Sequence, residues 1–105
     1  MGRSDAAEEY AEEVLALVER IPPGRVMTYG AIADVIGRGG PRQVGAVMSR
    51  YGGGVPWHRV VAASGRLVPG HEVEALRRHR AEGTPLRGPD RDRIDLTAAF
   101  WYPPE

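Results

Sequence analysis

A histidine and an arginine directly follow a tryptophan in the stretch Pro56-Trp57-His58-Arg59-Val60-Val61. An imidazole can act as a general base when a nucleophile lies within hydrogen-bond reach. The chain contains no cysteine, and Ser64, the nearest hydroxyl in the sequence, follows no nucleophile-elbow pattern. Trp57 itself offers one N–H donor and no accessible lone pair. An enzyme with His58 as its general base is therefore one hypothesis, but it lacks an evident nucleophile.

Basic residues are concentrated around this stretch, although the net charge of the chain is zero. Residues 35–70 carry five arginines and no acidic residue, whereas residues 1–34 carry seven acidic residues and three arginines. Planar guanidinium groups suit phosphates and base edges. The distribution therefore favours contact with nucleic acid, and a merely solvated basic surface is the alternative.

Composition excludes several classes of protein. A chain of 105 residues is expected to form a single domain over residues 1–105. No apolar run approaches the length of a membrane span, and the N-terminal residues lack the apolar region of a signal peptide. Without cysteines there are no disulfides or thiolate metal ligands. We therefore expect a cytoplasmic protein, nucleoid-associated in a bacterium, with no contact to membranes.

The three histidines, His58, His71 and His79, fall in no pattern typical of metal ligands. We therefore expect no metal ion and no cofactor.

The first helix is expected over residues 4–20. Ser4 can cap its start, and Pro22-Pro23-Gly24 cannot continue it. Apolar residues line one face at helical spacing: Ala7, Ala11, Val14, Leu15 and Val18. A brief extended segment is expected at residues 25–27.

Two further helices are expected over residues 29–36 and 41–51, with Thr28 as an N-cap and Pro41 in a first turn. Because a glycine-containing turn joins them, the region from about 28 to 51 is typical of a helix-turn-helix. The outer positions of the second helix are small, namely Gly45, Ala46 and Ser49. Small side chains let a backbone approach a narrow groove, so this helix suits the minor groove better than the major groove.

A small β hairpin, or wing, is expected at about residues 58–68, with its strands at 58–62 and 66–68. A flexible loop, Gly52-Gly53-Gly54, precedes it.

A last long helix is expected over residues 72–82, with Val73 and Leu76 facing inward and Gly83 after its end. The C-terminal tail, residues 84–105, is expected to contain a short strand at 94–96. Its aromatic residues 100–102 are expected to dock on the body of the domain. The fold class is thus mostly α with a small β hairpin.

Three motifs in this chain resemble those of the O6-alkylguanine-DNA alkyltransferases. Residues 56–60 resemble the active-site sequence Pro-Cys-His-Arg-Val, with Trp57 at the position of the alkyl-accepting cysteine. Residues 21–29 resemble the lead-in Ile-Pro-x-Gly-x-x-x-(Ser/Thr)-Tyr, and residues 42–45 the recognition-helix motif Arg-x-Val-Gly. The resemblance extends from about residue 10 to residue 82.

Because a tryptophan cannot accept an alkyl group, the resemblance points to the alkyltransferase-like proteins, which bind alkylated guanine without repairing it. It implies a winged helix-turn-helix domain, a monomer, and duplex DNA containing O6-alkylguanine as partner. It also implies base flipping from the minor groove and marking of the lesion for nucleotide excision repair proteins. The alternative is a helix-turn-helix transcription regulator that binds undamaged DNA by sequence.

The resemblance also implies roles for single residues in DNA binding. Tyr29 matches the tyrosine that rotates the target nucleotide, and Arg42 matches the arginine that fills the space the base leaves. Gln43, Gly45, Ala46 and Ser49 would lie on the DNA side of the recognition helix. Without the resemblance, Tyr29 would be a half-buried aromatic residue and Arg42 a solvated one.

Five residues are expected to form the lesion pocket: Tyr29, Trp57, His58, Arg66 and Val68. Of these, Arg66 and Val68 are the nearest replacements for a family segment that contacts the guanine and that this chain lacks. His58 and Glu82 match the family's proton relay, which has no thiol to activate here. We therefore expect Glu82 and Arg59 to support the pocket structurally.

Overall fold

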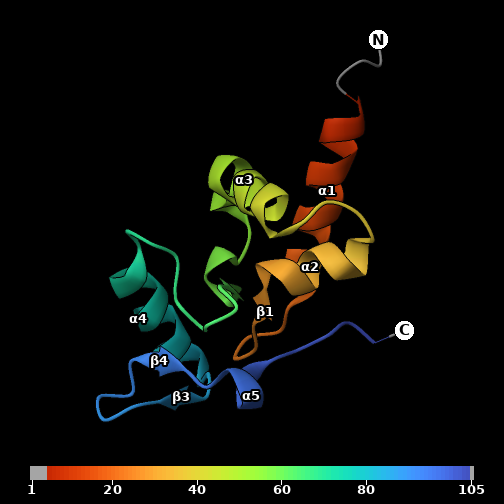
Figure 1. Ribbon diagram of the computed structural model, residues 1–105. Helices are drawn as coiled ribbons and strands as arrows, with labels where there is room; N and C mark the ends of the chain where they lie inside the picture. Colours follow the sequence, from red (N-terminus) through yellow and green to blue (C-terminus); the bar gives the residue numbers. More distant parts are fainter. Residues whose placement is uncertain (1–4, 105) are drawn as a thin grey trace.

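The computed structural model describes residues 5–104 and is mostly helical (Figure 1). The elements are, in chain order, α1 (Asp5–Arg20), β1 (Met27–Thr28), α2 (Tyr29–Ile36), α3 (Pro41–Tyr51), the 3₁₀ turns η1 (Gly52–Gly54) and η2 (Trp57–Arg59), β2 (Val60–Val61), α4 (Glu72–Glu82), β3 (Leu86–Arg87), β4 (Arg93–Ile94) and α5 (Leu96–Ala99). The mostly α fold class with a small β component is confirmed.

The helix α1 packs across both α2 and α3. Val14 and Val18 are fully buried on its inner face, as the helical spacing predicts. Ala7 is exposed and Leu17 is buried in its place, so the apolar face is turned slightly from the expected one. The expected cap, Ser4, lies outside the described residues.

The helices α2 and α3 form the expected helix-turn-helix. Thr28 caps α2, because its Oγ1 accepts a hydrogen bond of 3.0 Å from the N–H of Ala31. Gly37 ends α2 in the left-handed region, with φ of 89°. Val44 and Val47 bury the inner face of α3 against the core. The opposite face of α3 is left on the surface of the domain.

The valines of β2 pair with β1 as a short parallel ladder, with Met27 opposite Val60 and Thr28 opposite Val61. The expected hairpin of 58–62 with 66–68 is therefore wrong. The backbone is 3₁₀ up to Arg59, and both valines are fully buried between two apolar clusters. A strand buried on both faces is typical of parallel pairing.

Residues 62–66 form a turn, and the expected strand after it is not formed. The N–H of Ala62 donates to the carbonyl of Arg66 at 3.0 Å. Gly65, with φ of 85°, packs so closely that an added Cβ would lie 3.3 Å from the carbonyl oxygen of Ile94. Within residues 5–104, the one antiparallel hairpin is β3 with β4, which pairs Leu86 with Ile94. The β hairpin thus exists, but in the C-terminal tail.

The inner face of α4 also differs from the expected one. Val73 is 85% exposed, while Ala75 and His79 are fully buried. Since these two residues lie four positions apart, they occupy one face of the helix. Gly83 ends α4 in the left-handed region, as expected.

The C-terminal segment crosses back to the core and docks there through one aromatic residue (Figure 1). The N–H of Trp101 donates to the carbonyl of Val26 at 2.9 Å, and the Trp101 ring packs against the main cluster. Phe100 and Tyr102 are exposed, so only part of the expected clasp is formed. The expected strand at 94–96 ends at Ile94, because α5 begins at Leu96.

No helix within residues 5–104 has the length and apolar character needed to cross a bilayer. The same residues bring together no group of three His, Asp or Glu side chains that could hold a metal ion.

Candidate nucleic-acid interface

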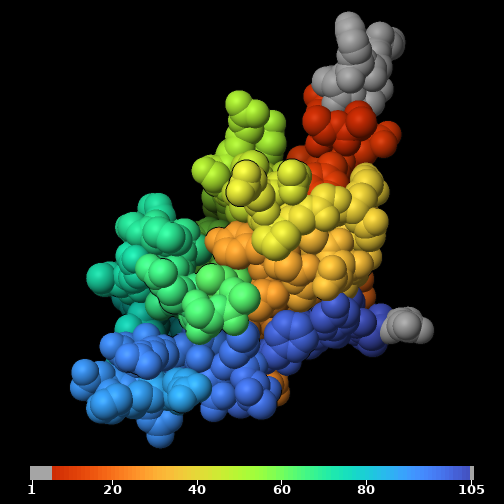
Figure 2. Space-filling model, in the orientation of Figure 1, coloured from red at the N-terminus to blue at the C-terminus, as the bar shows by residue number. Residues whose placement is uncertain are grey.

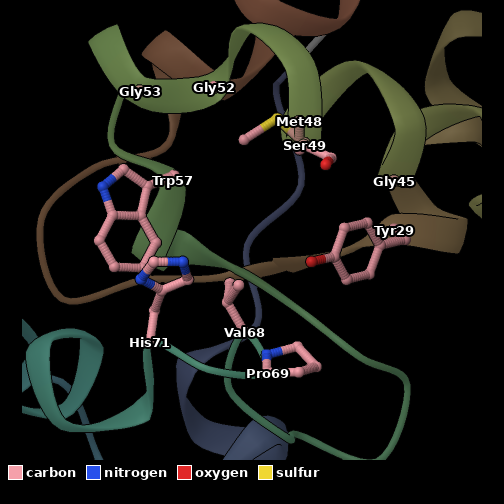
Figure 3. Close-up of a pocket in the computed structure, with 10 residues that line it drawn as sticks. All are labelled: Tyr29, Gly45, Met48, Ser49, Gly52, Gly53, Trp57, Val68, Pro69 and His71. Carbon is pink, nitrogen blue, oxygen red and sulfur yellow. The ribbon is translucent and has the colours of Figure 1, made fainter.

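A pocket of about 520 Å³ opens beside the outer face of α3. In Figure 2, the corresponding surface is a recess between yellow-green α3 and the teal start of α4. Ten residues line it, and Figure 3 shows them: Tyr29, Gly45, Met48, Ser49, Gly52, Gly53, Trp57, Val68, Pro69 and His71. None of them carries a permanent charge, and three are glycines that present bare backbone to the cavity.

Tyr29 is the first residue of α2 and is half-buried, as its position after the Thr28 cap dictates. Its hydroxyl points across the pocket towards the side that Trp57 and His71 line (Figure 3). Burial raises the pKa of Tyr29 above its usual value. The hydroxyl therefore stays protonated at neutral pH and is able to donate a hydrogen bond into the cavity.

Trp57 forms the opposite wall and is held by three neighbours. The rings of His58 and His71 meet it edge-on, with centroids 5.9 Å and 5.7 Å away. The guanidinium of Arg78 lies 5.1 Å from the centre of the indole, in a cation–π contact. Nε of Arg78 donates to Glu74 at 2.8 Å, which anchors that cation. The indole is thus fixed in position as a wall of the pocket.

His58 lies behind Trp57 and is bonded to the end of α4. Its Nε2 is 2.7 Å from Oε2 of Glu82. Burial lowers the pKa of His58, against the opposing effect of Glu82. The imidazole is therefore neutral at pH 7 and donates from Nε2 to the carboxylate. Its buried Nδ1 has no hydrogen-bond partner among residues 5–104.

The Glu82 carboxylate joins three segments of the chain. Oε1 accepts from the backbone N–H of Gly24 at 3.0 Å and from Nε of Arg59 at 3.2 Å. Oε2 accepts from a second Arg59 nitrogen at 2.8 Å, and Arg59 also donates to the carbonyl of Ile21 at 2.8 Å. Burial alone would raise the pKa of Glu82, but the hydrogen bonds from Arg59, Gly24 and His58 together lower it to about 2.

A second buried histidine completes the support of η2. His79 is fully buried, and its Nε2 lies 2.7 Å from the carbonyl oxygen of His58. A carbonyl only accepts, so Nε2 of His79 carries the proton, and Nδ1 accepts from the Thr84 hydroxyl at 2.8 Å. Burial lowers the pKa of His79, which keeps it neutral.

The outer face of α3 borders the pocket. Arg42, Gln43, Ala46 and Ser49 are all exposed on it. The Arg42 side chain makes no hydrogen bond or ion pair within residues 5–104, whereas Gln43 accepts from the N–H of Gly40 at 2.9 Å and so caps the helix. This face of the helix thus presents small residues and the unpaired Arg42 to solvent.

Gly45 lies between the pocket and this outer face, and nothing in the fold requires it to be glycine. A Cβ added there would meet no atom within 4 Å. Since glycine in a helix interior costs about 1 kcal/mol relative to alanine, the reason for it is to be sought outside the protein. It leaves room for close approach of a ligand.

Comparison with known proteins shows the family of the chain. Residues 9–83 match the family model described as 6-O-methylguanine DNA methyltransferase, DNA binding domain. The chain belongs to this family. Within it, the relatives below identify the chain as an alkyltransferase-like protein.

Three relatives carry the name DNA base-flipping protein. The one from Escherichia coli (strain K12) is 34% identical over 94% of this chain and 79% of its own length. The one from Vibrio parahaemolyticus is 27% identical over 91% of this chain and 99% of its own length.

Two solved structures from Schizosaccharomyces pombe have the same fold and are 30% identical to this chain, covering 91% of it and 97% of their own chains. One is Atl1 in complex with damaged DNA containing O6-carboxymethylguanine, with a TM-score of 0.78. The other is ATL in complex with DNA, with a TM-score of 0.76.

The structure of this alkyltransferase-like protein brings together five of the expected site residues around one cavity: Tyr29, Gly45, Ser49, Trp57 and Val68. His58, expected in the pocket wall, is only 3% exposed and lies behind Trp57. Arg66, which was also expected in the pocket, does not line this cavity. The turn at residues 62–66 directs it to a second hollow, which Leu67, Glu72 and Asp92 also line.

The basic stretch of the alkyltransferase-like chain offers fewer free cations than its composition indicates. Arg59 is committed to Glu82 and Ile21, and Arg38 pairs with Glu13 on α1 at 3.1 Å. Arg42, Arg50 and Arg66 are exposed and have no ion pair within the described part of the chain.

Sequence reasoning missed five lining residues: Met48, Gly52, Gly53, Pro69 and His71. Met48 had a usable signal, since it lies three residues after Gly45 and next to Ser49 on the same helix. His71 and Pro69 had none, because the path of residues 66–71 depends on long-range packing.

Glu82 and Glu74 allow a matched test of the support network. Both carboxylates have a pKa of about 2, Glu74 through hydrogen bonds from Arg77 and Arg78. Only Glu82 is largely buried. Because its pKa is depressed on folding, its contribution is complete above about pH 4.5 and is lost as the pH falls towards 2. We expect Glu82→Gln to lower the free energy of unfolding at pH 7 by about 2 kcal/mol.

Denaturant titrations between pH 7 and pH 2 measure this effect. The Glu82→Gln variant should lose much of the pH dependence of the parent, whereas Glu74→Gln should match the parent at pH 7, because water screens a surface pair. Equal effects of the two substitutions would contradict a special role for Glu82.

Proposed function

We propose that this protein is a non-enzymatic sensor of O6-alkylguanine in duplex DNA. The observation that carries the proposal is a pocket, large enough for a nucleobase, that opens beside α3 and has Trp57 as its wall, in a chain without cysteine. An indole can contact an alkyl group but cannot take it over, so the pocket binds the lesion and leaves it unchanged. The names of the relatives and the damaged DNA in the Atl1 complex support this function.

In this proposal the outer face of α3 enters the minor groove. Gly45, Ala46 and Ser49 let the helix backbone approach the floor of the groove, and Gln43 lies at the start of the same face. Proteins that bind there read little sequence and often insert a side chain between bases. Arg42 is the side chain placed for insertion, because it is exposed beside the small residues and is not engaged by another group within residues 5–104.

The flipped base then occupies the pocket between Tyr29 and Trp57. Flipping costs a few kcal/mol of stacking and pairing, and least for a damaged pair. The guanidinium of Arg42 stacks in the gap and offsets part of this cost. The volume of about 520 Å³ lies within the usual range of small-ligand sites, and the apolar walls from Met48, Trp57 and Val68 suit an alkyl substituent.

With no chemical step to end it, the complex persists. We infer that the protein acts as a cytoplasmic monomer and that the bound complex marks the lesion for nucleotide excision repair proteins. His58, Arg59 and Glu82 then serve to hold η2 and Trp57 in place.

Titration of duplexes that differ only in one guanine tests the proposal. At one fixed salt concentration, the duplex with O6-methylguanine should bind several-fold more tightly than the duplex with guanine. Fluorescence anisotropy of labelled DNA measures both dissociation constants. Equal affinities would contradict the proposal and favour a regulator that binds undamaged DNA, and recovery of an alkylated form of the protein would contradict its non-enzymatic character.

Arg42 is expected to carry the preference for the lesion. Arg42→Ala should bring the affinities for the two duplexes close together, because the flipped state loses its stacking partner. Arg50→Ala is the matched control, since Arg50 is an exposed arginine on the same helix. This control should weaken binding of both duplexes by the same factor. An Arg42→Ala variant that keeps the parental ratio of affinities would exclude the insertion role.

Gly45 gives a prediction in which stability and binding change in opposite directions. Gly45→Ala should stabilise the free protein by up to about 1 kcal/mol, because alanine favours a helix and the added Cβ meets no atom. The same Cβ should weaken binding to both duplexes, as it separates α3 from the groove. Thermal unfolding and the same anisotropy titration provide the two measurements. Unchanged DNA affinity would show that the groove does not reach Gly45.

A further inference from the structure

His71 lines the pocket and has no part in the proposed flipping of the base. It is the N-cap residue of α4, but its side chain makes no capping hydrogen bond. Its backbone is fully used, since its N–H donates to Val68 and its carbonyl accepts from Ala75. The imidazole is exposed, and neither ring nitrogen has a hydrogen-bond partner within residues 5–104. Two ring nitrogens are thus available to a ligand.

The imidazole is also held in place. Its ring meets the Trp57 indole edge-on at 5.7 Å, and Figure 3 shows it beside Trp57 on the side of the pocket to which the Tyr29 hydroxyl points. A side chain that is oriented by packing but lacks a polar partner is suited to binding.

His71 is the one lining residue of the pocket that can acquire a positive charge. The titratable or charged groups around it are Tyr29 on α2, His58 behind Trp57, and Glu72, Glu74 and Arg78 on α4. Tyr29 and His58 are neutral, and Arg78 is bonded to Glu74. Among the described residues, no carboxylate lines the cavity, so nothing within it repels an anion.

We propose that His71 makes the pocket select O6 substituents that carry a carboxylate over apolar substituents of the same size. This inference rests on the proposed function, because it concerns the occupant of the same pocket. A carboxylate that leaves water needs hydrogen-bond donors, and a charged donor is worth about twice a neutral one. The hydroxyls of Tyr29 and Ser49 are further donors among the residues that line the cavity.

The selection depends on pH. Imidazoles change charge in the range of pH 5 to 8, and an anion favours the protonated form. Binding of a carboxylate therefore strengthens as the pH falls, whereas binding of an apolar substituent does not depend on the charge of His71. A carboxymethyl group stays ionised over this range, so the dependence arises in the protein.

The test uses three duplexes that contain guanine, O6-carboxymethylguanine or the isosteric O6-isobutylguanine, each titrated at pH 6 and pH 8. For the parent protein, the ratio of carboxymethyl to isobutyl affinity should be roughly tenfold higher at pH 6 than at pH 8. In His71→Gln, which keeps a donor but cannot be charged, the ratio should be independent of pH. Arg66→Ala is the control, because Arg66 is a cation of the same segment outside the pocket, and its ratio should follow that of the parent.

The outcomes separate the two proposals. One outcome is a preference for both adducts over guanine, with a ratio of carboxymethyl to isobutyl affinity that does not change with pH or that His71→Gln leaves unchanged. This outcome overturns the role of His71 but not the proposed sensor function. A His71→Gln variant that weakens all three duplexes equally also overturns the role of His71, since this residue would then contact a phosphate. No preference for either adduct overturns the sensor itself.

Discussion

The carboxylate of Glu82 is the interaction on which the rest of the site depends. One side chain at the end of α4 accepts hydrogen bonds from the turn before β1 and from His58 and Arg59 of η2, and Arg59 in turn holds the end of α1. These are the segments that deliver Tyr29 and Trp57 to the two sides of the pocket. Burying a carboxylate is unfavourable unless every acceptor position is used, and here the partners come from segments far apart in sequence.

The same network gives a physical account of an alkyltransferase-like protein. In the alkyltransferases that this chain resembles, the histidine and glutamate serve a thiol. Here they are packed at hydrogen-bond distance without one, and the unpaired Nδ1 of His58 remains in the interior beside Trp57. The network therefore positions side chains of the site even where there is no thiol to activate. It holds a bulky aromatic residue as a wall at the position where the resemblance places a nucleophile.

The sequence predicted those features that neighbouring residues determine, such as the ends of helices. Thr28, Pro41 and Gly83 set helix ends through capping, and two of the three motifs contain Tyr29 and Trp57, which line one cavity in the structure. The parallel pairing of β1 with β2 was missed, because two-residue strands carry no periodic signal and their partners are 33 positions apart. Arg66 was misplaced for a similar reason, since the turn that redirects it packs Gly65 against Ile94, in a segment far along the chain.

The pocket has one side that the short ladder of β1 with β2 supports and another side, at Gly53, that is exposed to solvent. Tyr29 directly follows β1, and η2 with Trp57 directly precedes β2, so backbone hydrogen bonds between neighbouring strands tie the bases of both aromatic walls together. Strand spacing hardly varies, so the ladder holds the backbone segments that carry these walls at a fixed separation. Gly53 at the rim has no side chain, and an added Cβ there would meet nothing within 4 Å. In the proposed complex, bulk beyond the base would extend past Gly53 into solvent, so adduct length would matter less than adduct thickness.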